Sequence, residues 1–169
     1  MSDYDPTLTN RVIGHGLLVL FVGLIAGVML VFSLLGAIEL WPIPGIEADI
    51  PGSTRGWQAA HVGGIMNGIM LAGIALLMKH FQLTGRKALW VGWGMIITGW
   101  GNTLFYWAGN LSANRGLSVT ETPFGQGDIW GALAFFGGGI AMFFTFVAIG
   151  ILVVQAFGSL RDSSNLTSR

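Results

Sequence analysis

The sequence predicts an all-α integral membrane protein, a bundle of four transmembrane helices that forms a single domain over residues 1–169. Two properties of the composition predict this class, because 53% of the residues are hydrophobic and only 9% are charged. Soluble domains carry about 25% charged residues. The third observation is the length of four apolar runs, each of which reaches the roughly 20 residues that a helix needs to cross a bilayer. These runs cover residues 11–39, 57–78, 89–110 and 129–157.

The first run, residues 11–39, follows an N-terminal segment that carries acids rather than bases. A cleaved signal peptide needs a positively charged region before a short apolar run. The first run is therefore predicted to stay in the membrane as a span. The loop after it, residues 40–56, contains three prolines, which favour turns, and ends at Ser53 and Thr54, which suit the N-cap of the next helix.

The second and third runs are joined by the short connection HFQLTGRK, residues 80–87, which predicts two antiparallel neighbouring helices. A longer loop, residues 111–128, separates the third and fourth runs and is rich in Gly, Ser and Thr. Asp128 stands where its side chain can cap the last helix. A loop of this length between two helices of a bundle is often functional.

The distribution of cations predicts the orientation of the bundle. Most Lys and Arg residues fall at one predicted end, and only Arg55 and Arg115 fall at the other. The chain is then expected to be a multi-pass protein of a bacterial-type inner membrane. The positive-inside rule predicts that both termini and the 79–88 connection face the cytoplasm. The cations behind this prediction are Arg11, Lys79, Arg86, Lys87, Arg161 and Arg169. Tryptophans that mark the two membrane boundaries are Trp41, Trp57, Trp107 and Trp130 outside and Trp90 inside.

Charge and cysteine content exclude several classes of function. The net charge is zero, which argues against nucleic-acid binding by neutralisation of phosphates. The chain has no cysteine, which excludes disulfides, thiolate-bound iron–sulfur clusters and covalently attached haem. No Asp, Glu, Lys or Arg lies deep in a predicted span, and this weighs against an ion-coupled pump or proton transporter.

Polar side chains in the second and third spans are predicted to lie at the same depths. The second span runs inward, so His61 lies about one turn below the outer boundary and Asn67 about one and a half turns deeper. The third span runs outward, which places Tyr106 at the depth of His61 and Asn102 at the depth of Asn67. Asn102 and Tyr106 are four residues apart and share a helix face. Two helices that bring polar groups to one level indicate a site.

The angle between His61 and Asn67 suggests how this site is divided. The two residues are about 120° apart around the helix, with Gly64 between them in both angle and height. A large flat group could therefore lie against the bare backbone at Gly64, with His61 on one side. Asn67 would then serve a different face of the helix, or a site shared with a neighbouring subunit.

Two interpretations of His61 remain open from the residues alone. It is either a neutral histidine hydrogen-bonded to a carbonyl or water, or an axial ligand of a haem iron. His15 lies roughly 15–20 Å away along the membrane normal, so one haem cannot be held between the two histidines. A haem on His61 would keep its sixth position without a second histidine. An open position suits a Lewis acid or a ligand-binding centre better than an electron-transfer cytochrome.

A series of short motifs resembles the styrene oxide isomerase family. The motifs are GHG at 14–16, PGS with GW and AH at 51–61, Asn67–Gly68, GW with N and FY at 99–106, NRGL at 114–117 and FG with GDI at 124–129. Their order, the chain length and the four-span layout agree with the family over nearly the whole chain. The chain differs at position 98, where the family pattern has an acid and this sequence has Thr98.

The resemblance implies a trimeric membrane enzyme with ferric haem b at the subunit interface, which isomerises epoxides of the styrene oxide type to the aldehyde. His61 would be the axial ligand of the iron, and Asn67 and Tyr106 would hold the epoxide oxygen near it. The ferric iron would act as a Lewis acid that opens the benzylic C–O bond, and a 1,2-hydride shift would follow. The remaining site residues expected here are Gly64 and Arg115 (or Arg55) beside the haem, and Asn102, Phe105 and Trp100 around the substrate.

Two other functions stay open at this point. One is a membrane b-type cytochrome or haem sensor without epoxide chemistry. The absence of a second histidine at the depth of His61 counts against it. The other is a haem-free scaffold or small-molecule transporter, against which the shared polar level counts. The expected partners are a small apolar epoxide that arrives through the lipid bilayer and further copies of the chain, with no nucleic acid.

Overall fold

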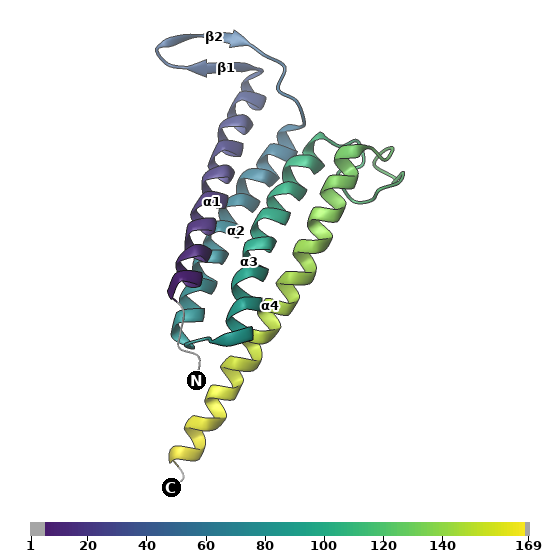
Figure 1. The fold of residues 1–169 in the computed structure, drawn as a ribbon. Helices are drawn as coiled ribbons and strands as arrows, with labels where there is room; N and C mark the ends of the chain where they lie inside the picture. The colour runs from purple at the N-terminus through teal and green to yellow at the C-terminus, as the bar shows by residue number, and fades with distance from the viewer. Residues whose placement is uncertain (1–5, 168–169) are drawn as a thin grey trace.

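The computed structural model describes residues 6–167, with side chains for residues 6–158, as four long helices and a β-hairpin (Figure 1). The helices are α1 (Pro6–Leu35), α2 (Thr54–His80), α3 (Gly85–Leu111) and α4 (Ile129–Thr167). The strands are β1 (Ala37–Leu40) and β2 (Ile43–Glu47). The helices run alternately up and down, so that chain neighbours lie side by side (Figure 1).

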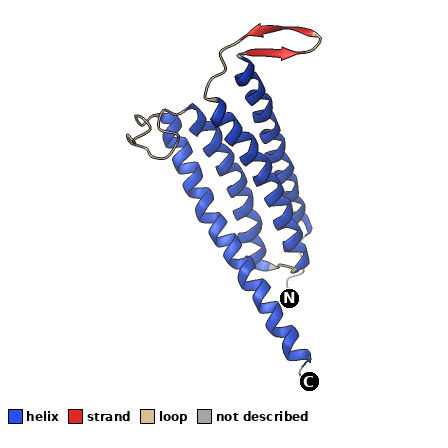
Figure 2. Cartoon of the chain, turned by 180° about the vertical axis from the view of Figure 1, so that it is seen from behind, coloured by secondary structure: helices blue, strands red, loops and turns tan. Residues whose placement is uncertain are grey.

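The helices occupy the four apolar runs, and three of them have the length and composition of membrane spans. These three are Pro6–Leu35, Thr54–His80 and Ile129–Gly158. α3 is as long as α2, at 27 residues, but is not one of the three. Its tryptophans, asparagines and glycines lower its hydropathy. α4 continues beyond residue 157, where the predicted span ends, and projects past the other helices (Figure 2).

The prediction of an all-α chain is wrong for the segment after Leu35, where a hairpin replaces the end of the predicted first span. β1 and β2 pair antiparallel, with Ile38 opposite Ile46 and Leu40 opposite Ile43. The chain reverses through a cis peptide between Trp41 and Pro42. The prolines at 42 and 44 suggested an irregular loop. Both strands of a two-stranded hairpin are edge strands, however, and edge strands tolerate proline.

α1 and α2 pack with their backbones in direct contact. A Cβ atom built on Gly64 would lie 2.5 Å from the Cα of Gly23, and one built on Gly16 would lie 3.0 Å from the carbonyl oxygen of Gly68. Helices in lipid gain packing contacts when small residues let their backbones approach. Gly23 and Gly64 therefore meet each other at a close contact between the two helices.

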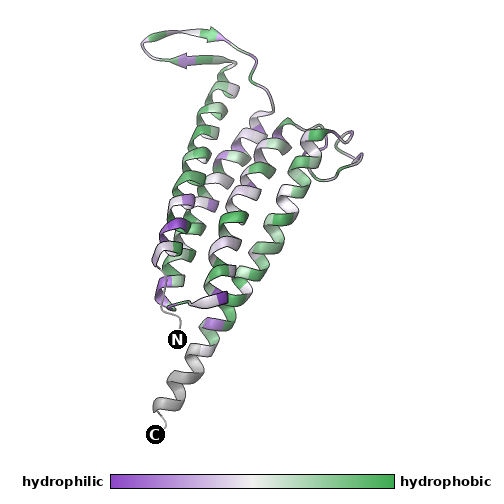
Figure 3. Ribbon diagram, in the orientation of Figure 1, coloured by the Kyte–Doolittle hydropathy of each residue, from purple (hydrophilic) through white to green (hydrophobic). Residues whose placement is uncertain are grey.

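The apolar core lies between the helices, and the outward surfaces of α1 and α4 are also apolar. α1 packs on α2, α3 packs on α4, and α3 also contacts α1 and α2. The largest fully buried apolar side chains are Leu71, Met78, Met95, Val12, Val19 and Val91. Hydrophobic residues nevertheless cover the exposed sides of α1 and α4 along most of their length (Figure 3). These sides are suited to contact with lipid or with another apolar surface.

Both predicted helix caps are present at the end of the bundle that carries the hairpin. The Ser53 hydroxyl accepts a hydrogen bond from the Gly56 backbone N–H at 3.0 Å and caps α2. Asp128 accepts from the Gly131 backbone N–H at 2.6 Å at the start of α4. Such caps satisfy backbone donors that have no partner inside the helix.

The cations separate between the two ends of the bundle as the sequence predicts. The start of α1 and the connection between α2 and α3 lie at one end, and the hairpin and the 112–128 loop lie at the other (Figure 1). Arg11, Lys79, Arg86 and Lys87 belong to the first end, and Arg55 and Arg115 belong to the second. The side chain of Arg161 and the whole of Arg169 lie outside the described residues.

Candidate functional site

Two amide side chains meet at the level that the sequence predicts for a site. Asn102 on α3 donates a hydrogen bond from Nδ2 to Oδ1 of Asn67 on α2 at 2.8 Å. Asn67 is only 7% exposed, and its own Nδ2 donates to the Gly63 carbonyl at 2.7 Å. A primary amide has two N–H donors. The second donor of Asn67 has no hydrogen-bond partner among the residues that the structure describes.

Tyr106 lies against the same part of α2. Gly63 leaves the space for it, because a Cβ atom built on Gly63 would overlap the Tyr106 ring. The ring packs beside a small buried cluster of Ala26, Trp57 and Ala60. The Tyr106 hydroxyl makes no hydrogen bond within the described part of the chain. Gly63 thus accepts a hydrogen bond from Asn67 at its carbonyl, and the Tyr106 ring packs where a side chain at position 63 would lie. Both candidate donor residues therefore contact Gly63.

His61 lies toward α1 and is held in one tautomer. Its Nδ1 is 2.9 Å from the carbonyl oxygen of Gly23, and Gly27 leaves room for the ring, since a Cβ there would lie 2.6 Å from Nδ1. A carbonyl oxygen can only accept, so Nδ1 carries the proton and the lone pair of the neutral ring is on Nε2. Metal-binding histidines are commonly oriented in this way by a backbone carbonyl.

His15 is held in the opposite tautomer. The indole N–H of Trp100 donates to His15 Nδ1 at 3.0 Å, and the two rings pack edge to face. The lone pair of Nδ1 is therefore used, and Nε2 of the neutral ring carries the proton. This contact makes His15 a hydrogen-bond partner of Trp100 and leaves it no free lone pair for a metal.

The donor set around His61 fits haem better than a bare metal ion. Within the described residues, no group of three His, Asp or Glu side chains is close enough to hold a metal. A metal bound to His61 must therefore bring most of its ligands with it, as haem iron does through the porphyrin nitrogens. The lone pair on Nε2 and the half-buried position of the ring fit that requirement.

Gly64 does not offer the open backbone surface that we expected for a flat group. It is buried against Gly23 of α1, and the prediction from the helical angles is corrected on this point. The sequence of α2 defines the angle between His61 and Gly64. It does not define which face of α2 is covered by α1.

The three residues predicted to line a substrate pocket lie toward three different helices. Trp100 contacts His15 on α1, Asn102 contacts Asn67 on α2, and the ring of Phe105 lies beside Gly138 on α4. A single copy of the chain therefore does not bring them to one surface. Trp100 is partly exposed, so it remains available to a surface that lies outside the bundle.

Arg115 belongs to a loop that is ordered by Asn114. The Asn114 side chain is fully buried, donates to the carbonyls of Ser118 and Thr120, and accepts from the Gly116 N–H. Arg115 is exposed, and its guanidinium lies 4.4 Å from the centroid of the Phe124 ring. Arg55 is also exposed, in the first turn of α2. Sequence reasoning singled out Arg115 and missed Asn114, for which the polar NRG turn was the available signal.

Thr98, the position at which the chain differs from the family pattern, lies at the contact between α3 and α4. Its hydroxyl is fully buried, donates to the Gly94 carbonyl at 2.9 Å, and lies 3.0 Å from the Thr145 hydroxyl. The Thr98 hydroxyl therefore joins two helices and makes no hydrogen bond with the Asn67 or Asn102 amide.

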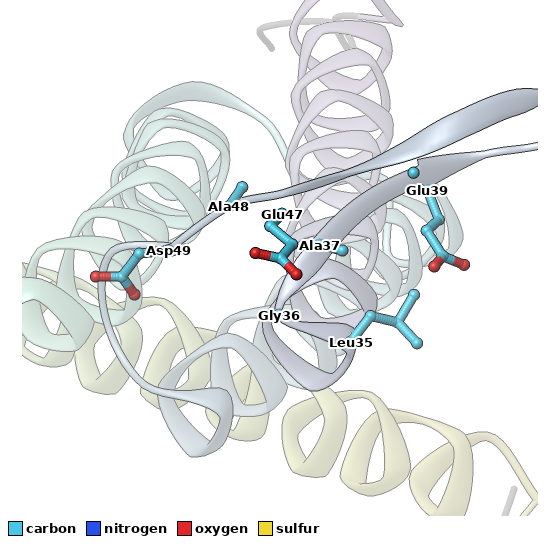
Figure 4. A pocket seen from close by; sticks show the side chains of 8 residues that line it. Leu35, Gly36, Ala37, Glu39, Glu47, Ala48 and Asp49 are labelled. Carbon is cyan, nitrogen blue, oxygen red and sulfur yellow. The ribbon is translucent and has the colours of Figure 1, made fainter.

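A separate open hollow of about 810 Å³ lies beside the hairpin. The carboxylates of Glu39, Glu47 and Asp49 are spread along it rather than gathered at one point (Figure 4). It contains none of the residues that the sequence predicts for the site. The polar level between α2 and α3 is therefore the better candidate for chemistry.

The fold and this polar level define a class: a helical protein of membrane type with hydrogen-bonding groups held inside its apolar region. Residues 8–157 match the family model for styrene oxide isomerase, and the chain belongs to that family. It is 36% identical over 153 residues to the styrene-oxide isomerase of Pseudomonas fluorescens, an alignment that covers 90% of this chain and 89% of the relative. All the candidate residues described above lie inside the matched region. Membership identifies the chain as an enzyme.

Proposed function

We propose that this enzyme isomerises an aryl epoxide of the styrene oxide type to the corresponding aldehyde, with ferric haem b bound through His61. The observation that carries the proposal is that two residues with an unused donor both contact Gly63. The unused donors are the second N–H of Asn67 and the hydroxyl of Tyr106. Two donors held in an apolar region suit a reaction in which an oxygen atom gains negative charge.

His61 would hold the haem through Nε2, because Nδ1 is committed to the Gly23 carbonyl. Ferric haem would supply Lewis acidity toward the epoxide oxygen. Arg115 is the residue we propose for the haem propionates, since it is exposed in the loop after α3 and His61 lies near the start of α2, at the same end of the bundle. The planar face of the haem would rest elsewhere than on Gly64, which is covered by α1.

The side chains of the site act on the oxygen and exclude water. Tyr106 and Asn67 donate hydrogen bonds to the epoxide oxygen while the benzylic C–O bond breaks and negative charge grows on it. A hydride then moves from the oxygen-bearing carbon to the benzylic carbon and leaves the aldehyde, so the reaction is redox-neutral. Apolar surroundings keep water away from the benzylic cation, which would otherwise be trapped as a diol.

We infer that α3 crosses the membrane together with the three more apolar helices. Its 27 residues span about 40 Å, which is enough for a bilayer, and it lies beside α2 and α4 along most of its length. The distribution of cations supports cytoplasmic termini in a bacterial-type inner membrane. A bilayer location would deliver an apolar epoxide directly to the site.

We also propose that the site is completed between copies of the chain in a homotrimer. His61 lies on the α1 side of α2, whereas Asn67 and Tyr106 lie on its α3 side. The large apolar surfaces of α1 and α4 are available to cover one another between copies. A haem held by His61 of one copy would then meet the donors of a neighbour.

The proposal is tested by purifying the protein in detergent, recording its absorption spectrum and adding styrene oxide. We expect a ferric haem spectrum with an exchangeable coordination site, and conversion of the epoxide to phenylacetaldehyde. A six-coordinate low-spin spectrum without turnover would favour the cytochrome instead. Protein without a Soret band or activity would favour a haem-free scaffold or transporter.

A further inference from the structure

We infer that Asn102 is a positioning residue that, together with the Gly63 carbonyl, keeps the donor end of the Asn67 amide toward the reacting oxygen. The inference rests on the proposed function, in which Asn67 donates a hydrogen bond to that oxygen. An amide has a donor end and an acceptor end of nearly equal size. Only the donor end stabilises developing negative charge, and the acceptor end would repel it.

The two hydrogen bonds of Asn67 select a single orientation of its amide. The Gly63 carbonyl can only accept, so the group facing it at 2.7 Å must be Nδ2. Oδ1 then faces Asn102, which offers an N–H at 2.8 Å. If the Asn67 amide were reversed, its oxygen would face the oxygen of Gly63, and the Asn102 amide would have to turn as well to accept from the reversed N–H₂. In a buried site with few other partners, such a reversal is strongly disfavoured.

Asn102 holds the Asn67 amide from a second helix, α3. Gly63 and Asn67 belong to the same helix, so their bond alone leaves the Asn67 side chain unattached to α3. The bond from Asn102 ties the amide to the helix that also carries Tyr106, one turn away. The two donors to the epoxide oxygen are thereby held in fixed positions relative to each other.

The neighbouring Thr103 provides a matched control. It is also half-buried on α3, and its hydroxyl donates to the Gly99 carbonyl of its own helix at 2.8 Å. Thr103→Val removes this bond without a change at Asn67. Asn102→Leu removes the donor to Asn67 at nearly constant side-chain volume.

In kinetic assays we expect Asn102→Leu to lower kcat by about 10- to 100-fold, the cost of a misplaced catalytic group, with KM changed by less than about twofold. Thr103→Val should leave both constants within about twofold of the wild type. Asn67→Ala should lower kcat by about 100-fold, and adding Asn102→Leu to it should cause little further loss. Independent, multiplying losses in the double variant would overturn the inference.

A second measurement does not depend on activity. The unfolding equilibria of the wild type, Asn67→Ala, Asn102→Leu and the double variant form a cycle that measures the coupling between the two side chains. We expect a coupling of about fivefold in the unfolding equilibrium constant, as for a buried hydrogen bond. No coupling overturns the inference whatever the activity, whereas an inactive wild type with normal coupling overturns only the proposed function.

Discussion

At the scale of single residues, the hydrogen bond on one ring nitrogen of a histidine decides what the other nitrogen can do. His61 donates through Nδ1 to the Gly23 carbonyl, and its Nε2 lone pair is free. His15 accepts at Nδ1 from Trp100, and its Nε2 carries a proton. The two residues lie in neighbouring helices, yet only His61 has a ring nitrogen whose lone pair is free in the neutral ring.

Replacing each of these histidines by alanine distinguishes their roles. We expect His61→Ala to be purified without haem and without isomerase activity, because it removes the only protein ligand we propose for the iron. His15→Ala should keep the haem, since it removes only a hydrogen bond to Trp100. The measurement is the ratio of Soret to protein absorbance. A His61→Ala protein with full haem content and normal turnover would refute the assignment.

Removing the hydroxyl of Tyr106 tests its role as a donor to the substrate. The ring of Tyr106 packs on Gly63, so Tyr106→Phe should keep this contact and leave the haem spectrum unchanged. We expect turnover to fall by about 100-fold, the usual effect of losing one donor to a developing oxyanion. Loss of the spectrum instead would mean that the hydroxyl supports the structure rather than the reaction.

The depth of the site residues along the helices was predictable from the sequence, but the neighbouring helix that each side chain faces was not. Helix arithmetic placed Asn67 and Asn102 at one level, and they form a hydrogen bond there. It could not place α1, whose Gly23 covers Gly64, or reveal that Trp100 binds His15. The rotation of one helix against another depends on side chains of both, and the pattern of a single helix contains only half of that information.

At the scale of elements, the helices follow from hydropathy and the hairpin does not. Long apolar runs make helices the best way to satisfy backbone hydrogen bonds away from water. The residues of β1 and β2 lack the simple alternation of a half-buried strand, and prolines lie in the turn at Pro42 and within β2 at Pro44. Ser53 and Asp128 were predictable as caps, since the need of a helix end for an acceptor is local.

The cap at Asp128 makes the stability of the end of the bundle that carries the hairpin depend on pH. Hydrogen bonds from the backbone N–H groups of Gly131 and Ala113 lower the pKa of Asp128 below its ordinary value of 3.8. A lowered pKa means that the carboxylate stabilises the folded state above about pH 4, and that this contribution is lost as the pH falls through the folded pKa.

We therefore expect the melting temperature of the wild type to fall on acidification from about pH 6 to pH 3. Asp128→Asn keeps a side-chain oxygen but has no group that titrates, so part of this fall should disappear in the variant. Melting curves in detergent at several pH values provide the measurement. Parallel curves for the two proteins would show that the cap contributes nothing to the acid sensitivity.

At the scale of the whole molecule, α2 carries the residue that we propose for haem binding on one side and the proposed donor Asn67 on the other. His61 contacts α1, while Asn67 contacts α3. The outer surfaces of α1 and α4 remain apolar and exposed in the single copy. These features are those expected of a subunit whose site is completed by a neighbour in a closed ring.

Mixed assemblies test this arrangement. We expect His61→Ala and Tyr106→Phe subunits, each nearly inactive alone, to regain activity when they are expressed together. A site between copies can combine His61 from one variant with Tyr106 from the other in about a quarter of the positions at equal mixing. Separately purified proteins mixed without exchange of subunits serve as the control. A site within one chain predicts no recovery.

The glycine contacts between α1 and α2 have a consequence for how this protein can evolve. Gly16, Gly23 and Gly27 on α1 meet Gly68, Gly64 and His61 on α2. One inserted residue in α1 would turn everything beyond it by about 100° and shift it by about 1.5 Å, which places side chains where only hydrogen fits. Insertions and deletions between homologues should therefore be confined to the hairpin, the 112–128 loop and the termini, while the spacing from residue 16 to residue 27 stays constant.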